Sequence, residues 1–177
     1  NRTQSRSFES QEGLRSMIRK FLKPLFNKEE GRKEILDYMR ELEVDVLART
    51  IFGEARNEGA VGMEAVACVV LNRVKTAQKI GGYWWGNNII QVCQKAYQFS
   101  CWNKDDPNLK RIQEVTESDI HFQTCLRIAR RAVIGALRDT TNGADHYHAD
   151  YVDPHWAQGQ KPVTVIGRHI FYRLIEV

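Results

Sequence analysis

The sequence lacks the signatures of several large protein classes. No run of apolar residues approaches the roughly 20 needed to span a bilayer, and residues 1–10 have no apolar stretch typical of a secretory leader. No P-loop, dinucleotide fingerprint or GxSxG motif occurs, and no CxxC, HExxH or Cys/His spacing indicates zinc. These absences argue against a nucleotide-binding enzyme, a nucleophile-elbow hydrolase and a zinc-ribbon protein.

Cysteine is scarce, with four residues in a chain of 177. Cys68 and Cys125 lie in apolar helical patterns, so we expect buried free thiols that are poorly suited to Cys–His catalysis. Cys93 and Cys101 flank an aromatic loop, where the spacing allows either free thiols or, in an exported protein, a disulfide.

The composition that is present fits a globular domain with a real core. Hydrophobic residues make up 42% of the chain and charged residues 27%, and the formal net charge is +4. This mild positive excess suits an acidic polymer and is equally compatible with weak attraction to nucleic acid. Because the basic residues are scattered rather than arranged in a stripe, we expect no nucleic-acid partner.

Residues 1–45 differ from the rest of the chain and predict an N-terminal helical arm. An apolar helix face over residues 14–22 is interrupted by Pro24, and Ile35, Leu36 and Met39 mark a second face among many charges. We expect the arm to pack on the domain or to contact another protein. Binding of the basic first helix to a membrane surface is a further alternative.

Residues 46–177 predict one domain that is mostly helical, with a small antiparallel β element, in the α+β class. Apolar periodicity predicts helices from Val46 to about Asn57, near Met63–Lys75, and over Phe122–Leu137. The second of these is apolar nearly all round, which is typical of a central buried helix. Residues 81–108 predict an aromatic, loop-rich segment, residues 164–172 a β-hairpin, and residues 144–149 a third short strand.

Glu54 is the first candidate for chemistry. It lies near the expected end of a helix, whose partial negative charge disfavours a second anion. Glu58 would share its helix face if the helix continued, and Ile51 and Phe52 offer apolar surface, so the neutral carboxyl is favoured. A neutral carboxylic acid can protonate a glycosidic oxygen. Alternatively, Arg56 could hold Glu54 ionised, and a glutamate in a helix is most often a surface residue.

Two further segments carry polar and aromatic side chains close together. In the first, Tyr97, Phe99 and Trp102 alternate with amides and hydroxyls, which suits either sugar binding or a loop that folds into the core. The second runs from Asp145 to Trp156, and its two histidines at 146 and 148 would point to the same side of a strand. No companion ligand pattern supports a metal there, so a polar, aromatic wall of a cleft is the better interpretation.

Read in order, these segments resemble the SleB-like cell wall hydrolase family. The resemblance covers about residues 46–173 and excludes the arm. Its motifs are LARTIFGEARNE at 47–58, GMEAVACVVLNRV at 62–74, QFSCWN at 98–103, ADHYHA at 144–149 and IGRHIF at 166–171. The Lys95-Ala96 pair departs from the proline-containing version in many relatives. This departure bears on the conformation of the loop and not on the assignment of the catalytic residue. Asn57 replaces the glycine of the family's GEARGE pattern.

The resemblance implies a lysozyme-like fold and a catalytic glutamate, which is Glu54 here. We also expect a set of substrate-binding residues, namely Tyr147, Phe99, Ser100, Gln98, Trp102, His148 and Glu58. For Glu58 we favour a supporting role, and we interpret Asn72 and Arg73 as polar support near the cleft. No metal and no cofactor is expected.

The implied activity is that of a lytic transglycosylase, which cleaves the MurNAc–GlcNAc bond of peptidoglycan and leaves 1,6-anhydro-MurNAc ends. Rival interpretations are a water-using muramidase with Glu58, Asp145 or Asp150 as second carboxylate, a non-catalytic glycan-binding module, and a zinc amidase. The expected location is the cell envelope, reached by export or by phage delivery. Because the sequence starts at Asn1, a leader or anchor removed beforehand is part of that expectation.

Overall fold

The computed structural model describes residues 28–177, and the helix face expected at residues 14–22 lies outside the described residues. The chain divides into two compact units at Arg40/Glu41, and the second unit runs from Glu41 to Val177. The sequence-based division into an arm over residues 1–45 and a domain from residue 46 stays a prediction.

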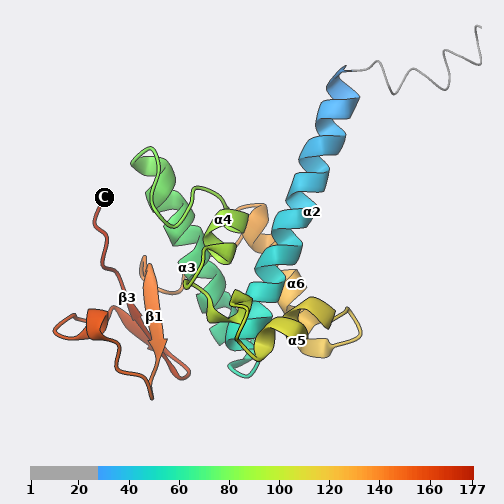
Figure 1. Cartoon of the computed structure of the whole chain (residues 1–177). Coiled ribbons are helices and arrows are strands. Elements are labelled where there is room, and N and C mark those ends of the chain that lie inside the picture. Colours follow the sequence, from blue (N-terminus) through green and yellow to red (C-terminus); the bar gives the residue numbers. More distant parts are fainter. Residues whose placement is uncertain (1–27) are drawn as a thin grey trace, which may run out of the picture. The chain divides into compact units, whose positions relative to one another are not determined.

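Helices supply most of the described residues, and α2 extends across the division between the two units (Figure 1). Their bounds, with the single-turn 3₁₀ helices η1 and η2, are α2 Lys28–Ala55, α3 Gly59–Lys79, α4 Ile89–Gln94, η1 Ser100–Trp102, α5 Asn108–Glu114, α6 Ile120–Val133 and η2 His155–Ala157. Side chains at two N-termini cap free backbone N–H groups. Asn88 accepts from the backbone of Gln91 ahead of α4, and Asp119 accepts from His121 and Phe122 at α6.

Some predicted boundaries were wrong. Helix α2 is one continuous helix where we predicted an arm helix and a separate helix from Val46, because no proline or glycine lies between Leu42 and Val46. The segment expected to be loop-rich contains α4 and η1, and α5 begins where it ends.

The apolar arm residues Ile35 and Leu36 are exposed. No helix among residues 28–177 is long and apolar enough to cross a membrane.

Three short strands form an antiparallel sheet in the order β1-β3-β2, which confirms the hairpin and the third strand. The strands are β1 His146–Ala149, β2 Thr164–Ile166 and β3 His169–Tyr172. In the register, Tyr147 pairs with Phe171 and Ala149 with His169. Since neighbouring residues of a strand face opposite sides, these four residues share one face of the sheet. That face packs on Ala65 and Val69 of α3.

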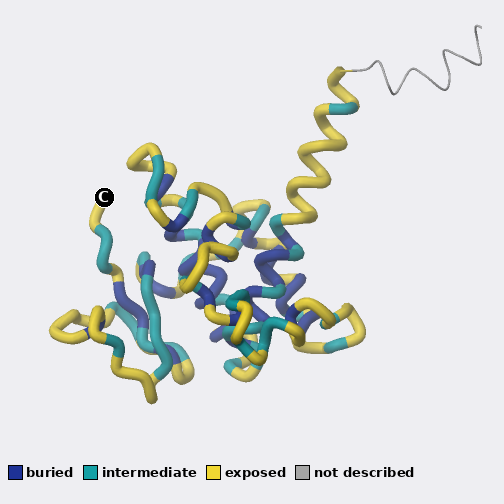
Figure 2. The backbone as a smooth tube through the Cα atoms, in the orientation of Figure 1, coloured by how far each residue is buried: buried dark blue, intermediate teal, exposed yellow. Residues whose placement is uncertain are grey.

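The core lies where α2, α3 and α6 pack together, and Figure 2 shows that buried residues concentrate there. Leu47, Val66 and Cys125 are among the fully buried side chains. As predicted, α3 is a central buried helix. All four cysteines are buried free thiols, so the alternative of a Cys93–Cys101 disulfide was wrong. Burial raises the pKa of Cys93 to about 12, which leaves the thiol protonated and unreactive.

Candidate active site

The carboxyl group of Glu54 receives two hydrogen bonds from distant parts of the chain. It lies in the last turn of α2, which ends one residue later at Ala55. The phenol Oη of Tyr147 on β1 donates to Glu54 Oε2 at 2.8 Å, and the backbone N–H of Cys101 in η1 donates to Oε1 at 3.3 Å. Three segments more than 40 residues apart therefore converge on one half-buried carboxyl.

Tyr147 is held in place by the sheet and by ring contacts. Its ring centroid lies 4.8 Å from that of His169 and 5.6 Å from that of Phe171, its partner in the register. Burial and then the nearby charge of Glu54 raise the pKa of Tyr147 well above its ordinary value. The phenol therefore stays protonated and can donate its hydrogen bond to Glu54 throughout the physiological pH range.

Beside Glu54 lies a polar cavity of about 250 Å³. It is lined by residues from the end of α2 and the following turn, and by residues from the sheet: Gly53, Glu54, Arg56, Asn57, Glu58, Ala149, Tyr151, Arg168 and His169. Two carboxylates and two guanidinium groups thus surround a space that could admit a polar ligand. We infer that this cavity is part of the candidate active site.

His169 and Arg168 are cavity residues that the sequence interpretation missed. His169 is buried, and its Nδ1 has no hydrogen-bond partner among residues 28–177. Burial lowers the pKa of His169 despite the opposing charges of Glu58 and Glu54. The signal that could have found it is strand alternation, because the hairpin places His169 on the same face as Tyr147.

Glu58 lines the same cavity but does not share a helix face with Glu54, because the helix does not continue that far. Helix α2 ends at Ala55, and Gly59 adopts a φ of +68° at the start of α3. The Glu58 carboxylate reaches the sheet instead, where Oε2 accepts from the backbone N–H of Arg168 at 3.0 Å. A side chain on Gly167 would place its Cβ 2.5 Å from the same oxygen. Glu58 therefore anchors the β2–β3 turn against α3.

Arg56 does not pair with Glu54 in the structure. Its guanidinium donates to the backbone carbonyls of Phe52 and Gly53 and to the side chain of Asn108 on α5. The alternative that Arg56 holds Glu54 ionised through a direct ion pair is therefore not realised.

The residues of the predicted aromatic segment, Gln98, Phe99, Ser100 and Trp102, do not line the cavity at Glu54. Phe99 is only 1% exposed, and the indole N–H of Trp102 donates to the buried Thr50 of α2 at 2.9 Å. Gln98 accepts from Arg73, whereas Ser100 is exposed. This segment contacts Glu54 through Cys101, whose thiol and backbone N–H both interact with the carboxyl, and the backbone bond could not be read from residue types.

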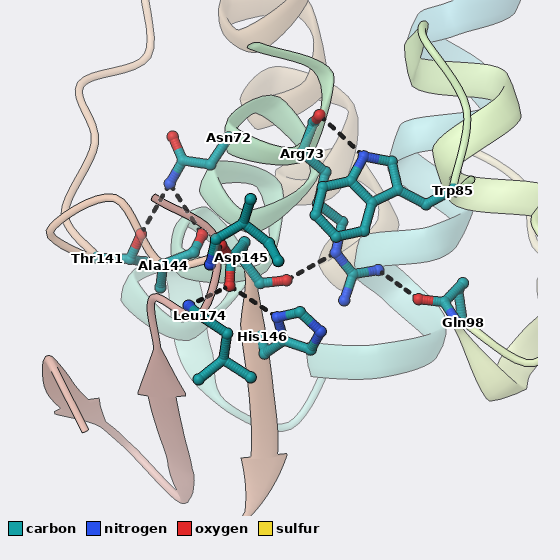
Figure 3. Close-up of polar contacts among 10 residues, drawn as sticks. Asn72, Arg73, Trp85, Gln98, Thr141, Ala144, Asp145, His146 and Leu174 are labelled. Carbon is teal, nitrogen blue, oxygen red and sulfur yellow. Dashed lines mark hydrogen bonds and ion pairs between the residues drawn. The ribbon is translucent and has the colours of Figure 1, made fainter. Parts of the chain in front are cut away.

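Asn72 and Arg73 are the polar support that the sequence indicated (Figure 3). Asn72 donates to the carbonyl of Ala144 at 3.0 Å, and Arg73 Nε donates to the carbonyl of Asp145 at 2.7 Å. Arg73 Nη1 also donates to Gln98, and its guanidinium lies over Phe99. The buried helix α3 therefore fixes two segments, one just before Tyr147 and one just before Cys101. These are the two residues that donate hydrogen bonds to Glu54.

His148 lies on the opposite face of β1 from Tyr147. As predicted, His146 and His148 share a side, and both rings contact Trp156. His148 Nε2 lies 3.1 Å from the hydroxyl of Tyr172, and neither residue lines the cavity at Glu54. Asp145 is buried and accepts from the backbone N–H groups of Leu174 and Ile175, so it fixes the C-terminal segment.

Solved structures establish the class of this fold. The domain resembles the catalytic domain of the Bacillus cereus SleB protein with a TM-score of 0.57 and 25% identity, over 74% of this chain and 89% of that one. It also resembles the catalytic domain of the germination-specific lytic transglycosylase SleB from Bacillus anthracis, with a TM-score of 0.56 and 24% identity, over 74% and 93%. The α+β, lysozyme-like fold predicted from the sequence is thereby confirmed.

The family model described as Cell Wall Hydrolase matches residues 57–172, and the chain belongs to this family. The spore cortex-lytic enzyme of Halalkalibacterium halodurans is 30% identical over 132 residues, which cover 73% of this chain and 34% of that protein. The Bacillus subtilis spore cortex-lytic enzyme is 27% identical over 132 residues, covering 73% and 37%. The chain therefore spans roughly a third of the length of these curated relatives. The family match begins three residues after Glu54.

Proposed function

We propose that this protein is a peptidoglycan lytic transglycosylase whose catalytic acid and base is Glu54. The observation that carries the proposal is the pair of donors on its carboxyl, the Tyr147 phenol and the Cys101 amide, beside a polar cavity. Membership of the cell wall hydrolase family and the names of the relatives support peptidoglycan as the substrate. The bacterial cell envelope is the proposed place of action, reached by export or phage delivery.

In the proposed reaction, the Glu54 carboxyl donates its proton to the oxygen between MurNAc and GlcNAc, and the bond from the muramoyl anomeric carbon to that oxygen breaks. The N-acetyl group of the muramoyl sugar stabilises the developing positive charge. The Glu54 carboxylate then removes the proton of the muramoyl 6-hydroxyl, whose oxygen bonds to the anomeric carbon and closes the 1,6-anhydro ring. Glu54 is protonated again at the end of the cycle, so the cycle needs no second carboxylate and no water.

The contacts of Glu54 suit its alternation between acid and base. After the proton leaves, both oxygens of the carboxylate accept a hydrogen bond, one from a phenol and one from a backbone amide. When Glu54 is protonated, the Tyr147 hydroxyl can turn and accept instead, because a phenol both donates and accepts. The site therefore has a partner for each protonation state without moving the backbone.

One observation favours the muramidase as the second candidate. Glu58 lines the same cavity as Glu54 and could act as the second carboxylate of a glycoside hydrolase. The other proposed partners are less suitable. Asp145 is buried, and its carboxylate accepts from a backbone N–H group. Asp150 accepts from the Arg168 guanidinium at 3.4 Å and does not line the cavity. The anchoring contact of Glu58 with the Arg168 amide favours a structural role instead.

The variants Glu54→Gln and Glu58→Gln test the proposal as a matched pair. Because a positioned acid contributes about 10² to 10⁴-fold to the rate, Glu54→Gln should reduce the release of soluble muropeptides from purified sacculi by that factor. Its unfolding temperature and its sedimentation with sacculi should be retained. Glu58→Gln should reduce the rate by about tenfold or less, since it loosens a turn rather than removing the acid.

Full activity of Glu54→Gln would refute the assignment of the catalytic acid. An equally large loss for both variants would favour the muramidase. Retention on sacculi by the wild-type chain without any release of muropeptides would favour a non-catalytic glycan-binding module.

A further inference from the structure

A second hollow is lined by the loop that follows α3, by α4 and by the two residues after α4. Its volume is about 510 Å³, within the range of small-molecule sites in proteins. Three aromatic rings and three side-chain amides dominate its lining, which consists of Tyr83, Trp84, Trp85, Gly86, Asn87, Ile90, Gln91, Gln94, Lys95 and Ala96. We refer to these ten residues as the aromatic groove. Figure 2 shows that much of the segment leading from α3 into α4 is exposed.

The aromatic groove presents an indole to solvent on a fixed frame. Trp84 is 52% exposed, whereas its neighbour Trp85 is fully buried and donates its indole N–H to the carbonyl of Arg73. The three rings contact one another, with Tyr83 lying 4.3 Å from Trp85 and Trp84 lying 5.7 Å from Trp85. An exposed tryptophan supported by two other rings offers a large rigid face without loss of side-chain freedom on binding.

Side-chain amides hold the loop while leaving donors available. Asn87 Oδ1 accepts from the backbone N–H of Tyr83, and Gln91 Oε1 accepts from the backbone N–H of Asn87. Both bonds use the side-chain carbonyl oxygens as acceptors. The NH₂ groups of Asn87 and Gln91 therefore remain available as donors, and neither donates to any residue in the described part of the chain. Gln94 is exposed as well. Aromatic faces rimmed by neutral amides match the apolar faces, hydroxyls and N-acetyl groups of amino sugars.

The aromatic groove is physically continuous with the support of the candidate active site. The guanidinium of Arg73 lies over the ring of Trp85 at 5.4 Å and over the ring of Phe99 at 5.2 Å. Trp85 also lies 6.1 Å from His146, the residue before Tyr147 (Figure 3). A polymer cleaved at Glu54 extends beyond the cleavage point, so a second surface of matching chemistry on the same domain can bind another part of the strand.

We propose that the aromatic groove is an accessory binding site for the glycan strand of peptidoglycan, with the Trp84 indole as the sugar platform. This inference rests on the proposed function for the identity of the polymer. Glycan is a better occupant than the stem peptide because Lys95 is the single ionic side chain in the lining, whereas a peptide rich in carboxylates calls for several cations.

The test measures binding without turnover, in full-length protein carrying Glu54→Gln. The probe is glycan strands from sacculi whose stem peptides have been removed by an amidase. Adding Trp84→Ala should weaken retention on these strands by about five- to tenfold, because a stacked ring is lost. Trp84→Phe should restore most of the binding, and Gln94→Ala should give a smaller loss. Tyr38→Ala, which removes a comparably exposed ring from α2, should bind like the parent.

Equal retention of the Trp84→Ala and parent proteins on peptide-free strands would overturn the proposal. Strong retention on intact sacculi combined with none on peptide-free strands would also overturn it and would identify the stem peptide as the occupant. Failure of the proposed function is seen separately, as unchanged turnover in Glu54→Gln, and does not affect this binding comparison. Thermal unfolding of each variant verifies that the fold is intact, which is expected because Trp84 lies at the surface.

Discussion

The cavity at Glu54 and the aromatic groove at Trp84 are built in opposite ways. The cavity combines the end of α2, the turn before α3 and two strands that lie more than 90 residues later, whereas the aromatic groove comes from one continuous stretch, residues 83–96. The first is polar and charged, and the second is aromatic and nearly neutral. The difference is consistent with the two proposals made above, in which the cavity carries the chemistry and the aromatic groove binds the polymer.

This division predicts different kinds of loss. Changes at the cavity should reduce turnover of any substrate, since they act on the transition state. Changes at the groove should appear as weaker binding of long strands.

Phe99→Ala should destabilise the protein most. The ring is fully buried, and truncation of a buried phenylalanine costs about 3 to 5 kcal/mol of unfolding free energy. Urea unfolding measures this loss, and activity should fall with it because the Cys101 amide follows Phe99 by two residues. Trp84→Ala serves as the groove counterpart and should cost about 0.5 kcal/mol or less, as is usual for surface changes. Equal stability losses would contradict the packing role of Phe99.

Tyr147→Phe should lower kcat by about 10 to 100-fold with little change in stability, because one donor to the Glu54 carboxylate disappears. Initial rates on sacculi and on short soluble glycans should fall by a similar factor. The groove counterpart is Tyr83→Phe, whose lost hydroxyl has no partner among residues 28–177, and its effect should be far smaller. An unaltered kcat for Tyr147→Phe would remove Tyr147 from the mechanism.

His169 should make stability depend on pH in a defined window. Burial lowers its pKa in the folded protein below the ordinary value of 6.5, so below about pH 6.5 the unfolded chain binds a proton that the folded chain does not. Stability should therefore decline as pH falls from 7 toward 5, and His169→Gln should flatten this decline. Asp139 and Asp145, whose folded-state pKa values are lowered below 3.8, act only at more acidic pH. Identical slopes in both proteins, measured by thermal unfolding, would contradict this assignment.

Metal chelation should have the smallest effect. The proposed cycle moves a proton through Glu54 alone, so prior treatment with EDTA should leave the rate on sacculi unchanged. A loss of activity that zinc restores would instead indicate an amidase of the metal-dependent kind.

The sequence anticipated the elements with regular apolar periods better than the site itself. The buried helix α3 and the β-hairpin followed from periodicity. Glu54 was a candidate from its place near a helix end, the resemblance added its catalytic role and Tyr147, and the two side chains prove to be in hydrogen-bond contact. The amide of Cys101 could not be foreseen, because a backbone donor leaves no trace in residue type. The place of His169 in the cavity could be predicted only from the register of the sheet.

Two of the remaining differences have one physical cause, which is that local patterns do not report where a helix stops. Glu58 would have shared a helix face with Glu54 had the helix continued, but α2 ends at Ala55 and the chain turns through Gly59. Conversely, α2 continues where two helices were expected. For Phe99 the residue pattern left both a cleft and a core position open, and the resemblance favoured the cleft, because an aromatic ring among polar neighbours has the same sequence pattern whether it is exposed or buried.

In the proposed reaction the substrate's own 6-hydroxyl replaces water as the nucleophile, with Glu54 as acid and base. The decisive test is mass spectrometry of the muropeptides that the wild-type chain releases from purified sacculi in water labelled with ¹⁸O. We expect products with anhydro-MurNAc ends, each one water lighter than the reducing sugar, and no incorporation of ¹⁸O. Products that carry only reducing ends and the ¹⁸O label would contradict it and establish a muramidase.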